Sequence, residues 1–248
     1  MAKEWVCGRP RLWRESPTSL PFCAGCQHGV GIRTVLEAIE ELAIEGKTIF
    51  LGGGGCVYPL PSMLDLDGMQ CPQGRAASIG SALKRLHGKE AIILVYQDDN
   101  DGLAVGTEPL LHAALRGDAV TVIMANNATY GSTGWQMAPP GNRIIPPEME
   151  KPNPSFPINI IELLSELEGV AYLARGTVSS PEDFAKTKRY VKTAMQKQIA
   201  GAGFSLVEIL LACPTRWHLT PEESLKWIRE EMAGKLPLGE WKGGEGRK

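Results

Sequence analysis

Residues 91–102 read Ala-Ile-Ile-Leu-Val-Tyr-Gln-Asp-Asp-Asn-Asp-Gly. The first six residues form an unbroken apolar run, as expected of a parallel strand that is buried on both faces. The polar residues after it would be costly in a purely structural turn, whereas asparagine and glycine tolerate the positive φ angles of a tight loop. The stretch therefore predicts a central strand that ends in an acidic loop with a function.

Helical and strand patterns alternate on both sides of this strand. Apolar residues at helical spacing predict a helix over residues 29–45, which Gly46 would end, and another over residues 75–87. Further helices are expected over residues 103–116, 157–168 and 181–200 and after the N-cap Thr220, and further strands over residues 47–51, 119–125, 170–174 and 204–211. This alternation indicates an α/β fold with a doubly wound, mostly parallel sheet.

Ligands of such sheets bind beyond the carboxyl ends of the strands. The loops at those ends cover residues 52–73, 97–102, 126–157 and 212–219. Residues 126–156 are rich in proline and glycine, and a loop of that length inside a compact domain is usually functional.

The length of 248 residues suits one large domain. We expect an irregular arm over residues 1–22, a single domain over residues 23–241 and a flexible tail over residues 242–248. The 26 lysines and arginines nearly balance the 28 acidic residues, so no broad attraction to nucleic acid or an anionic membrane follows.

The location of the protein is expected to be the cytoplasm. No apolar run reaches the ~20 residues that a membrane span needs, and the polar N-terminus does not resemble a secretory signal. Stable disulfides are rare in the cytoplasm. The six cysteines of the chain therefore favour a metal or redox role.

Two neighbouring strand ends carry oxygen ligands for a hard cation. Asp99 follows the first strand, and Asn127 follows the strand over residues 119–125. Together with the backbone carbonyl of Thr129, they would supply three oxygens to one Mg²⁺, and the helix starting near Leu103 would favour a phosphate there. The alternative is an acidic, solvated turn beside an ordinary asparagine turn, and spacing alone favours neither.

The cysteines suggest a second site. Cys23-Ala-Gly-Cys26 is compatible with a thiol redox pair, half of a zinc site or part of a cluster. Cys56 and Cys213 each follow a predicted strand, so they would converge with this pair, and four thiolates suit a [4Fe–4S] cluster. Alternatively, these two are small buried hydrophobes. Cys7 and Cys71 have no partner by this reasoning.

Several motifs resemble one known family, the β subunits of 2-oxoacid:ferredoxin oxidoreductases. Residues 21–29, Pro-Phe-Cys-Ala-Gly-Cys-Gln-His-Gly, are similar to its Cys-Pro-Gly-Cys-Gly-His segment. Residues 126–136, Asn-Asn-Ala-Thr-Tyr-Gly-Ser-Thr-Gly-Trp-Gln, are similar to its Asn-Asn-x-x-Tyr-Gly-Met-Thr-Gly-Gly-Gln run. Gly74-Arg75-Ala76 and Cys213-Pro214-Thr215 also match, so the resemblance extends in order from about Pro21 to about Trp241.

The resemblance implies a thiamine-diphosphate-binding fold of the pyrophosphate type. Asp99, Asn127 and the Thr129 carbonyl would hold Mg²⁺, and Cys23, Cys26, Cys56 and Cys213 would hold one [4Fe–4S] cluster. The residues implied to bind the cofactor are Cys56, Asp99, Asn100, Asn127, Thr129, Gly131 and Thr133. His28 would face the cofactor and Arg75 a carboxylate or phosphate, although structural roles compete for both.

The implied reaction is the oxidative decarboxylation of a 2-oxoacid with coenzyme A. It yields an acyl-CoA, CO₂ and two low-potential electrons, which the cluster passes towards ferredoxin or another acceptor. An α-type subunit would be needed for activity, and γ and δ ferredoxin-like subunits are expected. We expect neither a nucleic-acid partner nor a membrane span.

Two departures from the family pattern bear on this reading. The family's Gly-Asp-Gly-Asp is Asp98-Asp99-Asn100-Asp101 here, so an extra negative charge lies near the diphosphate. Trp135 replaces a glycine, which suggests a pocket for an aromatic or branched 2-oxoacid such as phenylglyoxylate, or else an aromatic side chain that is exposed or faces another subunit. The alternatives are a non-catalytic electron-transfer or structural paralogue that keeps only the cluster, and a zinc-bound structural module.

Overall fold

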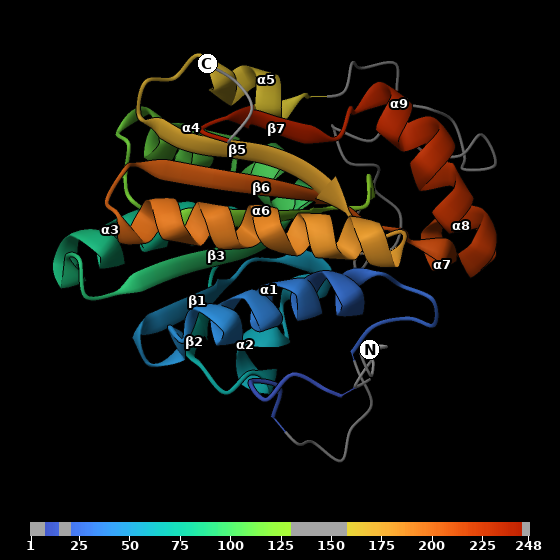
Figure 1. The fold of residues 1–248 in the computed structure, drawn as a ribbon, viewed down its shortest axis with the longest axis horizontal. Helices are drawn as coiled ribbons and strands as arrows, with labels where there is room; N and C mark the ends of the chain where they lie inside the picture. The colour runs from blue at the N-terminus through green and yellow to red at the C-terminus, as the bar shows by residue number, and fades with distance from the viewer. Residues whose placement is uncertain (1–7, 15–20, 130–157, 245–248) are drawn as a thin grey trace, which may run out of the picture.

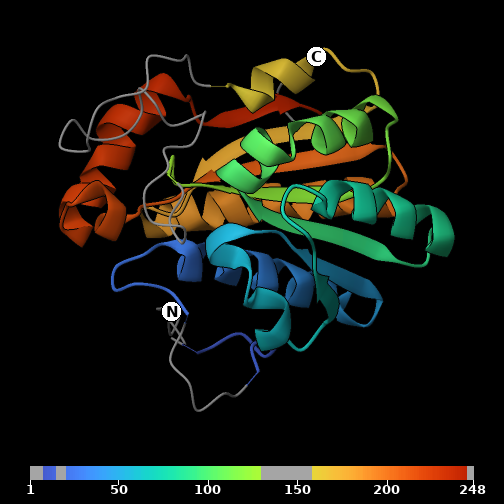
Figure 2. The ribbon, with the colours of Figure 1, turned by 180° about the vertical axis from the view of Figure 1, so that it is seen from behind.

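The computed structural model describes residues 8–14, 21–129 and 158–244, and it confirms the doubly wound, mostly parallel sheet (Figures 1 and 2). The described residues form a seven-stranded sheet of order β2-β1-β3-β4-β6-β5-β7, in which only β7 runs antiparallel. The strands are β1 Thr48–Gly52, β2 Asp67–Gln70, β3 Ile92–Asp98, β4 Thr121–Asn126, β5 Val170–Thr177, β6 Phe204–Leu210 and β7 Gly239–Lys242.

Helices cover both faces of the sheet. They are α1 His28–Leu42, α2 Leu60–Met63, α3 Ala76–His87, α4 Thr107–Leu115, α5 Ile160–Ser165, α6 Pro181–Ile199, α7 Pro214–Trp217, α8 Pro221–Trp227 and α9 Ala233–Lys235, with 3₁₀ turns Glu45–Lys47 and Gly55–Val57 and π-helical turns Asp101–Val105 and Ile228–Met232. Helices α1 and α6 pack on one face and α3, α4 and α5 on the other. Strand β3 serves both layers, because Leu94 and Tyr96 face the first and Ile93 and Val95 the second.

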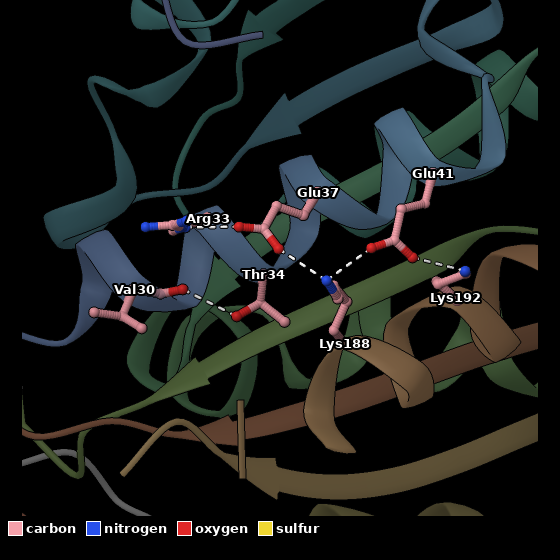
Figure 3. A network of polar contacts seen from close by, with 7 residues as sticks. All are labelled: Val30, Arg33, Thr34, Glu37, Glu41, Lys188 and Lys192. Atoms are coloured by element: carbon pink, nitrogen blue, oxygen red, sulfur yellow. Dashed lines mark hydrogen bonds and ion pairs between the residues drawn. The ribbon is translucent and has the colours of Figure 1, made fainter. Parts of the chain in front are cut away.

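A network of charges joins α1 to α6, two helices that lie far apart in the sequence (Figure 3). Lys188 Nζ lies 2.9 Å from Glu37 Oε2 and 2.7 Å from Glu41 Oε1. Lys192 also reaches Glu41, at 2.8 Å, and Arg33 pairs with Glu37 along α1 at 2.7 Å. The network fastens the helix that follows the Cys23–Cys26 segment to the longest helix of the same layer.

Two predicted helices differ in detail. The first ends at Leu42 and not at Gly46, because Ala43 adopts the left-handed conformation (φ 50°) and its N–H bonds to the carbonyls of Glu40 and Ile39. The helix expected over residues 103–116 is a π-helical turn followed by α4. The N-cap predicted at Thr220 is confirmed, and Glu223 completes a capping box with it.

Two strands were missed by the sequence prediction. The residues of strand β2 are all exposed at the sheet edge, and they include Asp67 and Gly68, which are poor strand formers. Strand β7 is short and half-buried. It includes Lys242, which was expected in the tail but donates hydrogen bonds from Nζ to the carbonyls of Ser165 and Leu167.

The described part of the N-terminal arm, residues 8–14, lies on the core. The side chains of Leu12 and Trp13 are buried, and Trp13 forms a β-bridge with Leu64. Within the described ranges, none of the helices is long and apolar enough to cross a membrane.

Candidate functional site

The predicted site residues gather where β1, β3, β4 and β6 end. In the sheet register Asp98 pairs with Ala125, and Asn126 pairs with Leu210. Asp99 and Asn127 therefore leave neighbouring strands side by side, and the cysteines at 56 and 213 follow the strands on either side. Asp99, Asn127 and Thr129 are all buried.

The acidic loop binds backbone amides with two of its carboxylates. Asp98 Oδ1 accepts a hydrogen bond from the Asp101 N–H at 2.8 Å, and the Asp98 carboxylate also accepts from the N–H groups of Cys56 and Asn100. Asp101 Oδ1 accepts from the Gly74 N–H at 2.7 Å. The extra charge at Asp98 is thus used to join the loop after β3 to the loop after β1.

The Gly-rich loop after β1 leaves no space for side chains next to these carboxylates. A Cβ at Gly53 would meet Asp101 Oδ2, and a Cβ at Gly55 would collide with Asp98 Oδ2. Gly55 also has a φ of +83°, which other residues rarely adopt. The two loops therefore approach as closely as backbone permits.

The Asp99 carboxylate has no compensating cation among the described residues. It is fully buried, and its Oδ2 has no hydrogen-bond partner in the described part of the chain. Burial raises the pKa of Asp99 well above its usual range, and the charges of Asp98 and, more weakly, Glu208 raise it further. A buried carboxylate in this state is a good ligand for a hard cation such as Mg²⁺, which would offset the charge.

Two successive side-chain turns shape the segment after β4. Asn126 Oδ1 accepts from the Ala128 N–H at 2.9 Å, and Asn127 Oδ1 accepts from the Thr129 N–H at 3.1 Å. Ala128 is held in the left-handed region at φ 59°. Trp217 Nε1 donates to the Asn127 carbonyl at 3.1 Å. Because an amide oxygen has two lone pairs, Asn127 Oδ1 can still bind a metal ion.

His28 lies against this turn. Its Nε2 is 3.2 Å from Asn127 Nδ2, and Phe22 stacks on its ring at 5.6 Å. Burial lowers the pKa of His28 to about 4, so the ring is neutral at neutral pH. With Asn127 Nδ2 as the donor, the proton is on Nδ1, which has no partner among the described residues. Arg75 instead lies exposed before α3, and its guanidinium donates to the Gly74 carbonyl at 3.3 Å.

The structure brings Cys23, Cys26, Cys56 and Cys213 within electrostatic range of one another. Burial, together with the other thiols, raises the pKa of Cys26 and of Cys56 to about 12 and also raises that of Cys213. The backbone N–H of His28 donates to Cys26, and that of Arg216 to Cys213. Cys71 is separate and lies near Asp101, and Cys7 lies outside the described residues.

No three His, Cys, Asp or Glu side chains of the described residues are close enough to hold a single metal ion. In the described part of the chain Cys23, Cys26, Cys56 and Cys213 are all free thiols, so each is available as a ligand.

Sequence reasoning missed a buried ion pair beneath the asparagine turn. Glu208 Oε2 accepts from Arg175 Nε at 2.6 Å, and Glu208 Oε1 accepts from Asn126 Nδ2 at 2.6 Å. The signal was present, because Glu208 and Arg175 are each a lone charge within an otherwise apolar strand, and such charges are rarely buried unpaired. The predicted residues Gly131 and Thr133, and Trp135 with them, lie outside the described residues.

Comparisons with known proteins were made for the whole chain. A family model described as thiamine pyrophosphate enzyme, C-terminal TPP binding domain, matches residues 55–209. The ketoisovalerate oxidoreductase subunit VorA of Methanothermobacter marburgensis is 32% identical over 234 residues, which cover 90% of this chain and 48% of that protein. The chain thus spans about half the length of that relative.

A second relative is covered more fully. The 2-oxoglutarate synthase subunit KorB of Archaeoglobus fulgidus is 30% identical over 216 residues, which cover 85% of this chain and 76% of that protein. Among solved structures, the 2-oxoglutarate:ferredoxin oxidoreductase of Magnetococcus marinus matches with a TM-score of 0.76 at 23% identity, covering 99% of this chain and 88% of that one. At that identity the structural likeness concerns the fold.

Proposed function

Because this chain belongs to the β-type subunits of the 2-oxoacid:ferredoxin oxidoreductases, within the thiamine pyrophosphate enzymes, we propose that it holds the reaction centre of such an enzyme. The centre comprises thiamine diphosphate, Mg²⁺ and a [4Fe–4S] cluster. The reaction is the oxidative decarboxylation of a 2-oxoacid with coenzyme A, which yields an acyl-CoA, CO₂ and a reduced low-potential acceptor.

The uncompensated carboxylate of Asp99 is the observation that carries the proposal. It is fully buried beside the turn at Asn127, and its Oδ2 lacks a partner among the described residues. Mg²⁺ bound by Asp99, the Asn127 side-chain oxygen and the Thr129 carbonyl would compensate this charge, and the diphosphate would complete the ion's shell.

The other residues of the site would shape it and orient its ligands. Thiamine diphosphate, when bound, supplies the carbon nucleophile and electron sink that decarboxylation requires. Gly53 and Gly55 let the loop after β1 approach the acidic loop, and the neutral His28 ring orients the Asn127 amide. Asn100, whose Oδ1 has no partner among the described residues, adds a polar contact.

The four cysteines would place the cluster beside the cofactor. Cys56 follows the Gly-rich loop, and its backbone N–H donates to Asp98, next to the metal ligand Asp99. Electrons leaving the substrate would therefore have a short path to the cluster. Cys23, Cys26 and Cys213 complete the ligand set.

The proposal includes partners. An α-type subunit, γ and δ ferredoxin-like subunits, coenzyme A and ferredoxin or another acceptor would complete the system in the cytoplasm. The names of the relatives suggest a branched 2-oxoacid or 2-oxoglutarate as substrate. An aromatic acid such as phenylglyoxylate belongs to the same panel.

The test uses the complex purified with its partner subunits. It is assayed for reduction of a low-potential dye with coenzyme A and pyruvate, 2-oxoglutarate, 2-oxoisovalerate or phenylglyoxylate. We expect one of these acids to support reduction, loss of the activity after chelation and desalting, and its return only when Mg²⁺ and thiamine diphosphate are both added. A complex that holds iron and sulfide but neither binds thiamine diphosphate nor oxidises any of the acids would instead support a non-catalytic, electron-transferring paralogue.

The extra carboxylate of Asp98, with Asp101 nearby, is the feature that favours this second candidate. Both are buried near the space expected for a diphosphate, and burial raises the pKa of Asp98 to about 7. The Asp98 carboxylate accepts hydrogen bonds from backbone N–H groups, which argues for the catalytic reading. Asp101 Oδ1 accepts from the Gly74 N–H, whereas Asp101 Oδ2 has no partner among the described residues.

A further inference from the structure

The buried pair of Arg175 and Glu208 connects the neighbouring strands β5 and β6 next to the candidate site. The two residues face each other in the register of β5 and β6, and their side chains are 0% and 1% exposed. Arg175 Nη2 donates to Asn159 Oδ1 at 2.6 Å, and Nη1 donates to the Pro237 carbonyl at 3.2 Å. Trp241 covers the guanidinium at 5.3 Å.

A buried ion pair of this kind contributes little net stability to a fold. Burying two charges costs several kcal/mol each, and apolar residues of similar volume often serve the fold equally well. The strands around the pair are otherwise filled with apolar side chains such as Leu206 and Ile209. The two charges therefore call for a role other than holding the sheet together.

That role follows from the chemistry of the carboxylate. An ionised carboxylate only accepts hydrogen bonds, so it forces Asn126 to present its amide N–H groups at Nδ2, 2.6 Å from Glu208 Oε1. Asn126 Oδ1 must then point the other way, where it accepts from the Ala128 N–H at 2.9 Å. This bond closes the turn that holds Ala128 at φ 59°.

The turn at Ala128 then sets the orientation of the proposed metal ligands. With Ala128 in the left-handed region, the Asn127 carbonyl points to Trp217 Nε1, at 3.1 Å. The Thr129 N–H points back to Asn127 Oδ1, also at 3.1 Å. A continuous series of hydrogen bonds thus runs from Arg175 through Glu208 and Asn126 to the residues that follow β4.

The charge of the pair is also relevant. Glu208 lies within electrostatic range of Asp99. The Arg175 guanidinium, bonded to Glu208 at 2.6 Å, offsets that negative charge. Without Arg175, a second uncompensated carboxylate would lie near the diphosphate.

We propose that Glu208 and Arg175 are positioning residues for the magnesium–diphosphate site: Glu208 orients the Asn126–Asn127 turn, and Arg175 holds and neutralises Glu208. This inference rests on the proposed function, because it presumes that the site binds thiamine diphosphate. It predicts that the pair matters more for cofactor binding than for folding.

The first variant is Glu208→Gln in the assembled complex. A glutamine offers one oxygen to two donors, so its NH₂ would face the donor of either Arg175 or Asn126. We expect the Kd for thiamine diphosphate at fixed Mg²⁺ to rise about 10- to 100-fold, as is typical when a residue supporting a metal ligand is lost. At saturating cofactor kcat is expected to stay near the wild-type value.

The double variant Arg175→Met/Glu208→Leu separates positioning from folding. Apolar residues at both positions should preserve the thermal midpoint of the cofactor-free complex, while the affinity for thiamine diphosphate stays reduced, because nothing orients Asn126. The control is Thr121→Val, which removes a buried hydrogen bond to the Ala194 carbonyl at the opposite end of β4 and should leave the affinity unchanged.

The outcomes are distinct. A folded double variant that binds thiamine diphosphate as tightly as the wild type would overturn the inference and leave the proposed function standing. A wild-type complex that binds none would overturn the proposed function and this inference with it. Weakened binding in both variants, with the control unchanged, supports the positioning role.

Discussion

Single residues in the loops after β1 and β3 determine how closely the two loops approach. The family glycines that flank the metal aspartate are absent here, and the carboxylate of Asp98 stands in place of one of them. The structure shows that this carboxylate accepts hydrogen bonds from backbone N–H groups, including that of Cys56. Gly55, in the loop after β1, leaves the space that the Asp98 side chain occupies.

Gly55→Ala is expected to lower the free energy of unfolding by more than about 1 kcal/mol, because the new methyl group would collide with Asp98 and the backbone φ is +83°. Thermal melting of the purified protein measures the loss. Gly46→Ala is the matched control, since a Cβ there meets nothing within 4 Å. Equal midpoints for the two variants would contradict the packing described.

The cysteines allow a second test at this scale. Changing any one of Cys23, Cys26, Cys56 or Cys213 to serine should lower the iron and sulfide content of the complex, because a cluster needs all four thiolates. Cys71→Ser should retain the wild-type content, since Cys71 lies apart from the four, beside Asp101. Iron lost equally from Cys71→Ser, or retained in Cys56→Ser, would argue against this ligand set.

Sequence patterns predicted the elements that carry long apolar runs or helical periodicity. Strand β3 and helix α3 are examples, because their burial follows directly from their residues. Strands β2 and β7 could not be predicted, because their residues are exposed or half-buried and pair only through the backbone. The C-terminal end of α1 was also not predicted, because the left-handed Ala43, whose N–H bonds to the carbonyls of Glu40 and Ile39, ends the helix before the glycine at position 46.

The junction of α1 and α6 should be sensitive to acid. Hydrogen bonds and charge from Lys188 outweigh burial and lower the pKa of Glu37 and Glu41, and the two carboxylates raise the pKa of Lys188. Carboxylates with lowered pKa values stabilise the fold at neutral pH and lose that contribution as the pH falls below about 4. The ammonium's contribution is lost only in strong base.

Lys188→Met should therefore destabilise the protein by about 1 kcal/mol at pH 7, and the difference from the wild type should shrink towards pH 3. Urea unfolding at several pH values measures this difference. Lys226→Met removes a single exposed contact to Glu230 at 3.9 Å and should have no measurable effect. A Lys188→Met effect that is constant with pH would exclude the ionic origin of the junction.

On the scale of the whole molecule, the sheet topology gathers residues from distant parts of the chain at the carboxyl ends of the strands. The sequence predicted that Asp99 and Asn127 would lie side by side there, because strand ends of a parallel sheet share an edge. It did not predict what orients these side chains, since the contacts from Glu208 to Asn126 and from Trp217 to Asn127 join residues about 80 or more positions apart. Such contacts depend on packing that no local pattern records.

The central claim is that Asp99 and its neighbours hold thiamine diphosphate through Mg²⁺ beside a four-cysteine cluster. The most direct test is the ratio of thiamine diphosphate to iron in the purified complex after incubation with Mg²⁺ and the cofactor, for the wild type and Asp99→Asn. Removing an unpartnered buried charge should not harm folding. We expect both components in the wild type, and unchanged iron with little thiamine diphosphate in the variant. Equal thiamine diphosphate in both proteins, or iron without thiamine diphosphate in the wild type, would contradict the claim.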